Sequence, residues 1–383
     1  MNNSRHSTIR IPNLFQADSP LVTVLLAITV LLAGFGLLMV LSASSVVSGI
    51  SNDGNFFHET FIQFISLILG GVGLVVASRL PITFWQKSRN YLVGIVFAAQ
   101  ALVLFTPLGI ESGGNRNWLD LGFTSVQPSE FLKPAIIVWI AVWIHDNPHI
   151  VSRPMAEWGE LIKWVGIPFA AVVIGRDIGT AIVLFLIIVG MLAFAGVAAR
   201  PLWSLSALAL LGGFAYIALS DRRERFIAWI FGCAPNDFEG VCWQSTHGYW
   251  ALGSGGFFGL GAGSSRAKWS WLPHAESDYI FAIIGEEFGL LGALFLLITL
   301  AALGFTFVRL MRAYPQPLTR TLIGGVFIWL VGQSFINIGV VLGVLPVLGV
   351  PLPMISSGGS AIVANLAAIG VVVSCVRFEE RYG

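Results

Sequence analysis

Two carboxylates in the second half of the chain stand where acid–base chemistry could be done. Asp278 lies directly before a long apolar run, and Glu286 follows about two helical turns deeper if that run is a helix. Partial desolvation raises the pKa of a carboxyl group, which suits a general base near neutral pH. An Asp that opens a helix is equally an ordinary cap with a favourable dipole contact, so both interpretations of Asp278 stay open.

Basic residues crowd the polar segment that precedes Asp278. They are Arg222, Arg223, Arg225, Arg266 and Lys268. A basic cluster at a membrane boundary attracts phosphate or pyrophosphate headgroups, although Arg222 and Arg225 could equally snorkel to the interface. Asp177 is similarly ambiguous, since it could cap the apolar run that follows it or act as a ligand at the outer face. The sequence has no metal-ligand cluster and no phosphate-cradling nucleotide loop.

Two pairs of residues could be coupled. Glu130 and Lys133 lie three residues apart at the start of an apolar run, so a helix would place them on one face, where we expect them to pair. Such a pair could serve the function or only hold helices together. Cys233 and Cys242 share the polar segment and fit either a disulfide or two inert thiols. Cys375 lies inside an apolar run and is expected to pack as a small hydrophobe.

Composition places the chain in a membrane. Of its 383 residues, 56% are hydrophobic and 11% are charged, against roughly 25% charged in soluble domains. The net charge of +1 gives no reason to expect nucleic acid as a partner. An all-α polytopic membrane protein with ten transmembrane helices is predicted, because ten apolar runs reach or approach the about 20 residues of a span. They are 21–43, 61–77, 91–105, 131–144, 161–174, 179–194, 202–219, 279–308, 321–345 and 355–376. The fifth and sixth runs could instead form one re-entrant or broken element.

The distribution of Lys and Arg predicts the orientation, because cytoplasmic loops carry the excess of both. Most of them fall on the side of the N-terminus, so we expect both termini in the cytoplasm. The predicted parts are a cytoplasmic segment 1–20, a membrane domain 21–377 and a short cytoplasmic tail 378–383. The membrane domain includes a large extracytoplasmic loop, 221–277, between helices seven and eight. Its Trp and Gly content favours a compact loop on the membrane surface with close backbone approaches.

Ordered motifs along nearly the whole chain, from about residue 20 to 376, resemble those of the SEDS proteins (shape, elongation, division and sporulation). These motifs are NWLDLG at 117–122, QPSEFLK at 127–133, DIGTA at 177–181, Arg222 with Arg225, Gln244, ALGSGG at 251–256, SDYIFA at 277–282, GEEFG at 285–289, Asn337, PLP at 351–353 and SSGGS at 356–360. Ser357 stands where the family usually carries Tyr. The segment 38–45, LMVLSASS, resembles the septal branch (FtsW) more than the elongation branch (RodA).

The resemblance implies a ten-span glycosyltransferase that polymerises lipid II into peptidoglycan strands. In that reaction the GlcNAc 4-hydroxyl of the acceptor attacks the anomeric carbon of the donor, with inversion and loss of undecaprenyl pyrophosphate. Asp278 matches the family's essential Asp and is the expected catalytic base. Substrate contacts are expected at Arg116, Trp118, Glu130, Lys133, Asp177, Arg222, Arg225, Gln244, Lys268, Ser356, Gly358 and Gly359. No metal site is assigned, and assistance by a divalent cation at the pyrophosphate stays open.

The resemblance also implies a partner and a location. A class B penicillin-binding protein would crosslink the strands, other divisome proteins would assemble with the chain, and the site would be the bacterial plasma membrane at the division septum. Two alternatives stay open: a lipid II flippase, and the same polymerase chemistry in cell elongation. Small residues in the last two spans are expected to receive the partner's helix. They are Gly324, Gly325, Gly332, Ala361, Ala364, Ala367 and Ala368.

Overall fold

The computed structural model describes residues 19–112, 114–122, 124–149, 157–220, 222–233 and 240–382. Most of the predicted N-terminal segment (1–18), parts of the predicted outer loop (Asp221 and 234–239) and Gly383 at the end of the predicted tail lie outside the described residues. The helices are α1 (Pro20–Ser51), α2 (His58–Arg79), α3 (Ile82–Phe105), α4 (Pro128–Asp146), α5 (Gly159–Leu161), α6 (Ile167–Ile174), α7 (Ile178–Phe194), α8 (Ala199–Leu219), α9 (Arg223–Phe231), α10 (Trp243–Gly255), α11 (Ile280–Ala313), α12 (Pro317–Phe327), α13 (Gln333–Val341) and α14 (Gly359–Tyr382). Two π-helical turns, η3 (Ile162–Gly166) and η4 (Ile328–Gly332), continue α5 into α6 and α12 into α13.

Membrane-spanning helices dominate the fold. Within the described residues, six helices are long and apolar enough to cross a membrane. They are α1, α2, α3, α11, the continuous unit Pro317–Val341 and Gly359–Arg381. A helix satisfies its own backbone hydrogen bonds, which is why apolar runs of this length fold this way in lipid. The other four predicted runs coincide with α4, with the unit from α5 to α6, with α7 and with α8. The total of ten crossings stays a prediction.

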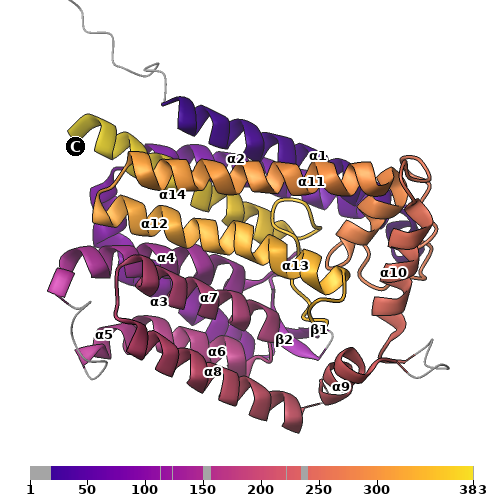
Figure 1. Ribbon diagram of the computed structural model, residues 1–383, viewed down its shortest axis with the longest axis horizontal. Helices are drawn as coiled ribbons and strands as arrows, with labels where there is room; N and C mark the ends of the chain where they lie inside the picture. The colour runs from indigo at the N-terminus through magenta and orange to yellow at the C-terminus, as the bar shows by residue number, and fades with distance from the viewer. Residues whose placement is uncertain are drawn as a thin grey trace, which may run out of the picture.

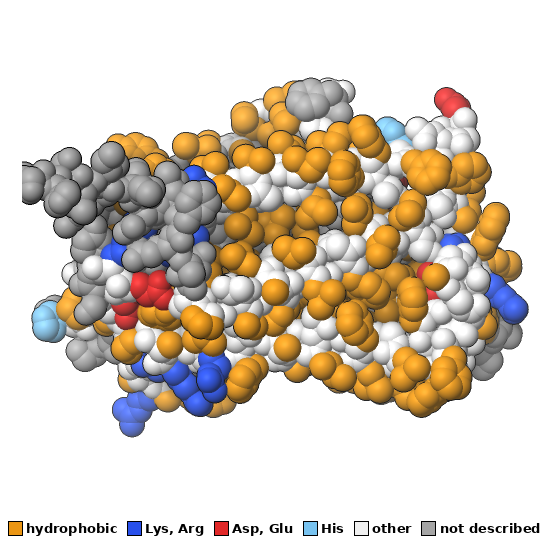
Figure 2. Space-filling view, turned by 90° about the horizontal axis from the view of Figure 1, so that it is seen from above, with side chains coloured by type: hydrophobic (Ala, Val, Ile, Leu, Met, Phe, Trp, Pro, Cys, Tyr) orange, Lys and Arg blue, Asp and Glu red, His pale blue; other side chains and the backbone are white. Residues whose placement is uncertain are grey.

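The two ends of the helical bundle differ (Figure 1). The start of α1 and the C-terminus lie at one end, whereas α9, α10 and a small sheet lie at the other. The sheet has the antiparallel order β1 (Gly109–Ser112), β2 (Asn115–Asp120) and β3 (Ser125–Val126). Figure 2 shows hydrophobic side chains over the middle of one face and most charged side chains near its two ends, the distribution expected of a surface that faces lipid.

Glycines bring the outer segment into direct contact with α11. Inside α11, Gly289 has φ 63° and ψ −158°, which interrupts the helix. The Leu260 N–H donates to the Glu286 carbonyl at 3.0 Å, and the Leu290 N–H donates to the Gly256 carbonyl at 3.0 Å. A Cβ on Gly259 would lie 2.1 Å from the Glu287 carbonyl oxygen. The close backbone approaches expected of this segment are therefore present, and only glycine permits them.

The expected docking face on the last two spans is wrong for several of its residues. A Cβ on Gly324 would lie 2.8 Å from Phe194, and one on Gly325 would lie 2.7 Å from the sulfur of Met191. Ala364 is also fully buried. These small side chains let helices of this chain pack closely on one another, so they do not offer a surface to a partner.

Candidate active site

Asp278 belongs to a tight turn, residues 273–279, that leads into α11. The N–H groups of Ser277 and Tyr279 both donate to the His274 carbonyl at 3.2 Å, and His274 itself has φ 55°. The Asn337 side-chain amide donates to the Asp278 carbonyl at 2.7 Å. The backbone on both sides of Asp278 is therefore fixed, and we call this segment the Asp278 turn.

The Asp278 carboxylate is half-buried and accepts no hydrogen bond from the described part of the chain. Its Oδ2 atom faces Gly349, where an added Cβ would lie 3.6 Å away. Burial raises the pKa of Asp278 to about 6. His274 acts on this pKa in the downward direction, and Glu276 and Asp177 act upward. A carboxylate with this pKa and no competing partner is suited to remove a proton near neutral pH.

The segment between α13 and α14 locks the Asp278 turn in place. The Ser356 hydroxyl donates to the Ser277 carbonyl at 2.5 Å and accepts from the Leu352 N–H at 2.8 Å. The Gly358 N–H donates to the Gln63 side-chain oxygen at 3.1 Å, which ties the same segment to α2. Ser356 and Gly358 were both expected to contact substrate. The Ser356 hydroxyl holds the turn, and the Gly358 N–H holds the segment against α2.

Asp177 is an N-cap of α7 and a junction between elements. Its Oδ1 atom accepts from the Thr180 N–H at 3.1 Å. Its Oδ2 atom accepts from the side chains of Asn117 at 2.9 Å, Gln127 at 3.0 Å and Ser129 at 3.3 Å. The cap interpretation is confirmed. Because Asp177 is 4% exposed and both its oxygens are occupied, it ties α7 to β2 and to the start of α4.

Two arginines lie near this junction. Arg222 donates from Nη2 to the Asn115 side chain at 2.6 Å and more weakly to the Arg176 carbonyl at 3.4 Å. Partial burial lowers the pKa of Arg222, but a guanidinium stays charged in proteins. Arg225 is exposed, and its charge acts both on Arg222 and on Tyr279 beside the catalytic candidate. The pair supplies positive charge on the Asp177 side of Asp278.

Four other expected contact residues hold the scaffold. Arg116 donates to the carbonyls at the end of α3, from Nε to Val103 at 2.9 Å and from Nη2 to Thr106 at 2.7 Å. Trp118 is half-buried in β2 opposite Ile110. The Gln244 amide donates to the Pro273 carbonyl, where the Asp278 turn begins. A Cβ on Gly359 would lie 2.7 Å from the Ser66 hydroxyl, so this glycine permits the contact between α14 and α2.

The expected pair of Glu130 and Lys133 forms inside the bundle. The two charged atoms lie 2.7 Å apart, and the side chains are almost fully buried. The Lys133 ammonium also donates to the Gln333 side chain at 3.1 Å and lies 5.4 Å from the centre of the Trp329 ring. Gln333 in turn donates to the Pro351 carbonyl at 2.8 Å. The pair therefore supports the segment after α13 from within the bundle.

Two adjacent carboxylates hold the Gly-rich segment against α11. Glu286 accepts from the Ser265 hydroxyl at 2.5 Å and from the Arg266 N–H at 3.0 Å. Glu287 accepts from the N–H groups of Gly263 at 3.0 Å and Ser265 at 3.3 Å. Lys268 lies 3.4 Å from Glu287 and is 6% exposed. Glu286 and Lys268 are thus parts of an anchor, which we call the Glu286–Glu287 anchor.

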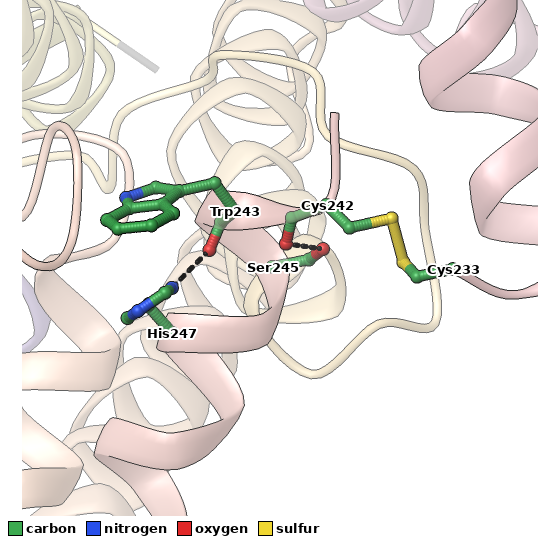
Figure 3. Close-up of a disulfide and its surroundings, with 5 residues drawn as sticks. All are labelled: Cys233, Cys242, Trp243, Ser245 and His247. Atoms are coloured by element: carbon green, nitrogen blue, oxygen red, sulfur yellow. Dashed lines mark hydrogen bonds between the residues drawn. A yellow bond between two sulfur atoms is a disulfide. The ribbon is translucent and has the colours of Figure 1, made fainter. Parts of the chain in front are cut away.

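A disulfide joins Cys233 and Cys242 between the end of α9 and the start of α10 (Figure 3). Just after it, the Ser245 hydroxyl donates to the Cys242 carbonyl at 3.1 Å, and His247 Nδ1 lies 2.8 Å from the Trp243 carbonyl. The free thiol of Cys375 is buried, as expected. Among the described residues, no group of three or more His, Cys, Asp or Glu side chains could hold a metal ion.

The sequence profile of the FtsW/RodA/SpoVE family of cell cycle proteins matches residues 23–381. The chain belongs to this family. A probable peptidoglycan glycosyltransferase FtsW of Mycobacterium tuberculosis is 34% identical over 365 residues, which cover 93% of this chain and 68% of that protein. Its counterpart in Coxiella burnetii is 34% identical over 360 residues, covering 92% and 95%. Stage V sporulation protein E of Bacillus subtilis is 31% identical over 361 residues, covering 93% and 97%. The resemblance to SEDS proteins is confirmed.

Solved structures share the FtsW/RodA/SpoVE fold. The rod shape determining protein RodA of Thermus thermophilus is 26% identical, with a TM-score of 0.67, over 97% of this chain and 100% of that one. A peptidoglycan synthase complex that coordinates polymerization and crosslinking contains a chain that is 24% identical, with a TM-score of 0.72 over 96% of this chain and 99% of that one. Because the chain in that complex is only 24% identical, its similarity supports a shared fold and nothing further.

Several residues that shape the site were not among the expected site residues. Gln63 and Gln333 are amides inside apolar helices, where a polar group needs a partner, and both hold the segment after α13. Asn117 and Gln127 bind Asp177, and Glu287 shares the anchor. The sequence could have indicated these residues, because they lie in membrane helices or in family motifs. It could not show their hydrogen-bond partners, because those depend on how helices distant in the chain pack together.

Proposed function

We propose that this chain is a peptidoglycan glycosyltransferase that joins lipid II units into glycan strands. The observation that carries the proposal is the Asp278 carboxylate, which is half-buried, raised in pKa to about 6 and held by a fixed turn without a hydrogen-bond partner in the described part of the chain. Two relatives that are 34% identical to this chain over more than 90% of its length are named probable peptidoglycan glycosyltransferase FtsW. The proposal for septal synthesis rests on the same relatives.

In the proposed step, Asp278 removes the proton from the 4-hydroxyl of the acceptor GlcNAc. The acceptor oxygen bonds to the anomeric carbon of the donor from the face opposite its phosphate. The bond from that carbon to the phosphate oxygen breaks, and undecaprenyl pyrophosphate leaves with the electron pair. Positive charge near the leaving group stabilises the transition state, a role that suits Arg222 and Arg225.

The finer topology and the partner also belong to the proposal. We infer ten crossings with both termini in the cytoplasm, because the start of α1 and the C-terminus share one end and the basic residues favour that end. Asp278 then faces the outer side, at the septum of the bacterial plasma membrane. Linear strands need a crosslinking reaction to become a wall, so we expect a class B penicillin-binding protein, a transpeptidase, and other divisome proteins as partners.

The experiment is polymerisation of labelled lipid II by the purified protein in lipid nanodiscs, with a parallel assay in vesicles that follows lipid II between leaflets. The proposal is supported if glycan chains form and a lysozyme-type muramidase digests them. Redistribution between leaflets with no chain formation overturns it in favour of a flippase. A variant with Asp278 replaced by Asn separates real turnover from contaminating activity.

A further inference from the structure

A polar cavity of about 180 Å³ lies directly behind the Asp278 turn. It is lined by Ser44, Val47, Ser48, Ser51, Glu59, Glu276, Ser277 and Ser357. Glu276 and Ser277 are the two residues that precede Asp278, while the serines and Val47 of α1 and Glu59 of α2 form the opposite wall. The cavity thus adjoins the proposed base, and none of its lining residues is among the expected substrate contacts.

The walls of this cavity are fixed by hydrogen bonds. The Ser48 hydroxyl donates to the Asn55 carbonyl at 2.8 Å, which joins the end of α1 to the loop before α2. The Ser357 N–H donates to the Glu276 carbonyl at 2.8 Å, which joins the segment before α14 to the Asp278 turn. A cavity with a preset shape binds a ligand without first ordering its own walls.

Charge distinguishes this cavity from the other side of Asp278. Its lining contains the carboxylates Glu59 and Glu276 and no Lys, Arg or His. A pyrophosphate would be repelled there, whereas Arg222 and Arg225 supply positive charge on the Asp177 side. Carboxylates and hydroxyls together are strong hydrogen-bond partners for the hydroxyl groups of a neutral sugar.

Size restricts the ligand further. At about 30 Å³ per water molecule, the cavity corresponds to about six waters, below the range of about 300–1,000 Å³ for pockets that enclose a drug-sized ligand. The cavity is partly open, so one sugar ring of a lipid-linked substrate can enter it while the rest of the substrate stays outside. We propose that the cavity is a subsite for one neutral sugar ring of the acceptor. This assignment rests on the proposed function. It places the acceptor on the α1–α2 side of Asp278 and the donor pyrophosphate on the side of Arg222 and Arg225.

The test uses a soluble GlcNAc–MurNAc disaccharide, without lipid or pyrophosphate, as a competitor of lipid II polymerisation. The decisive variant is Glu59→Gln, because Glu59 does not act on the pKa of Asp278, whereas Glu276 does. We expect the inhibition constant of the disaccharide and the KM for lipid II to rise about tenfold, with kcat largely kept. Val47→Trp, which fills the cavity, should give the same shift. The matched controls are Glu111→Gln, an exposed acid on β1, and Val30→Trp, an exposed position on α1; both should leave the two constants unchanged.

Three outcomes overturn the subsite. The first is an unchanged inhibition constant in both Glu59→Gln and Val47→Trp. The second is a higher Mg²⁺ concentration for half-maximal activity in Glu59→Gln with the inhibition constant unchanged, which would make the cavity a cation site. The third is absence of disaccharide binding to the Asp278→Asn protein by saturation-transfer NMR. The binding measurement needs no turnover, so it separates failure of the subsite from failure of the polymerase proposal.

Discussion

Asp278 gains its chemistry from what surrounds it. The residue stands at the N-terminus of a helix, a position where an Asp commonly caps backbone N–H groups. Here the first turn of α11 receives no side-chain cap, because Tyr279 occupies the cap position and Asp278 lies one residue earlier. The carboxylate therefore stays available, and its burial keeps its pKa above the ordinary value.

Replacement of Asp278 by Asn is expected to lower polymerisation by about 10²- to 10⁴-fold, the usual cost of a lost general base. The variant should still fold. The folded-state pKa of about 6 lies above the ordinary 3.8, so stability falls as pH rises from about 3.8 to about 6 and stays lower above that range, and a neutral amide avoids that cost. Lipid II turnover and thermal unfolding in detergent measure the two effects. Near-normal turnover would refute the role of Asp278.

The pH dependence of the wild-type enzyme follows from the same group. A base must be ionised to act, so kcat/KM for lipid II should rise with pH up to about 6 and then level off. Below that value the slope should approach tenfold per pH unit. Initial rates between pH 4.5 and 8 measure the profile. A flat profile between pH 5 and 7 would contradict a base with this pKa.

The buried pair of Glu130 and Lys133 should show strong coupling. Removing one partner leaves a buried charge without its counter-charge, which costs about 3–5 kcal/mol. We expect Glu130→Gln and Lys133→Met each to lower thermal stability and activity sharply, and the double variant to lose much less than the sum. A double-mutant cycle on unfolding free energies measures this. Additive losses would show that the two charges act independently.

At the scale of elements, the broken helix α11 sets the position of the outer segment. The interruption at Gly289 frees backbone groups of α11, and the segment before the Asp278 turn takes them up. The Glu286–Glu287 anchor adds four further N–H contacts from residues 263 to 267. Backbone and side chain thus hold the same segment, which fixes the approach to the Asp278 turn from one side.

Gly259→Ala should break this arrangement. The residue has φ 83°, and an added Cβ would lie 2.1 Å from the Glu287 carbonyl oxygen, so the backbone must shift. We expect a loss of about 1–3 kcal/mol in stability and a clear loss of activity. Gly253→Ala on α10 is the control, because nothing lies within 4 Å of its added Cβ. Thermal unfolding and lipid II turnover of the two variants give the comparison, and equal behaviour would argue against the close approach.

At the scale of the whole molecule, α4 forms the centre of the bundle. Its side chains from Ala135 to Ile144 are buried, and it packs against α3, α7, α12 and α14. The outer helices α1, α2 and α8 instead expose Val, Leu, Ile and Phe side chains. A fold with its polar junctions inside and apolar side chains outside is stable only when lipid covers it.

Gly325→Leu tests the packing of the inner helices. The added side chain meets Met191 and Ile137 across the contacts of α12 with α7 and α4, so we expect a lower unfolding temperature or loss of the folded protein. Gly71→Leu on α2 has open space around it and should be tolerated. Yield of monodisperse protein and thermal unfolding measure both. If the Gly325→Leu protein is stable but no longer binds the expected transpeptidase, α12 would be the docking face after all.

The amino-acid sequence by itself determined the membrane environment, because twenty-residue apolar runs have no other stable place. It also determined the candidate base, since an ionisable side chain beside such a run is costly unless it has a task. Its short motifs determined the family. The pairing of Glu130 with Lys133 was readable as well, because helical spacing is local.

Only the tertiary structure decided how the other polar residues are used. Asp177, Ser356 and Lys268 looked like ligands for substrate, yet their polar atoms meet groups from other elements. The small residues of α12 and α14 looked like a docking face, yet most of them face neighbouring helices. The physical reason is the same in each case. A motif specifies which groups need partners, but whether the partner is a substrate or another helix depends on contacts between segments far apart in the chain.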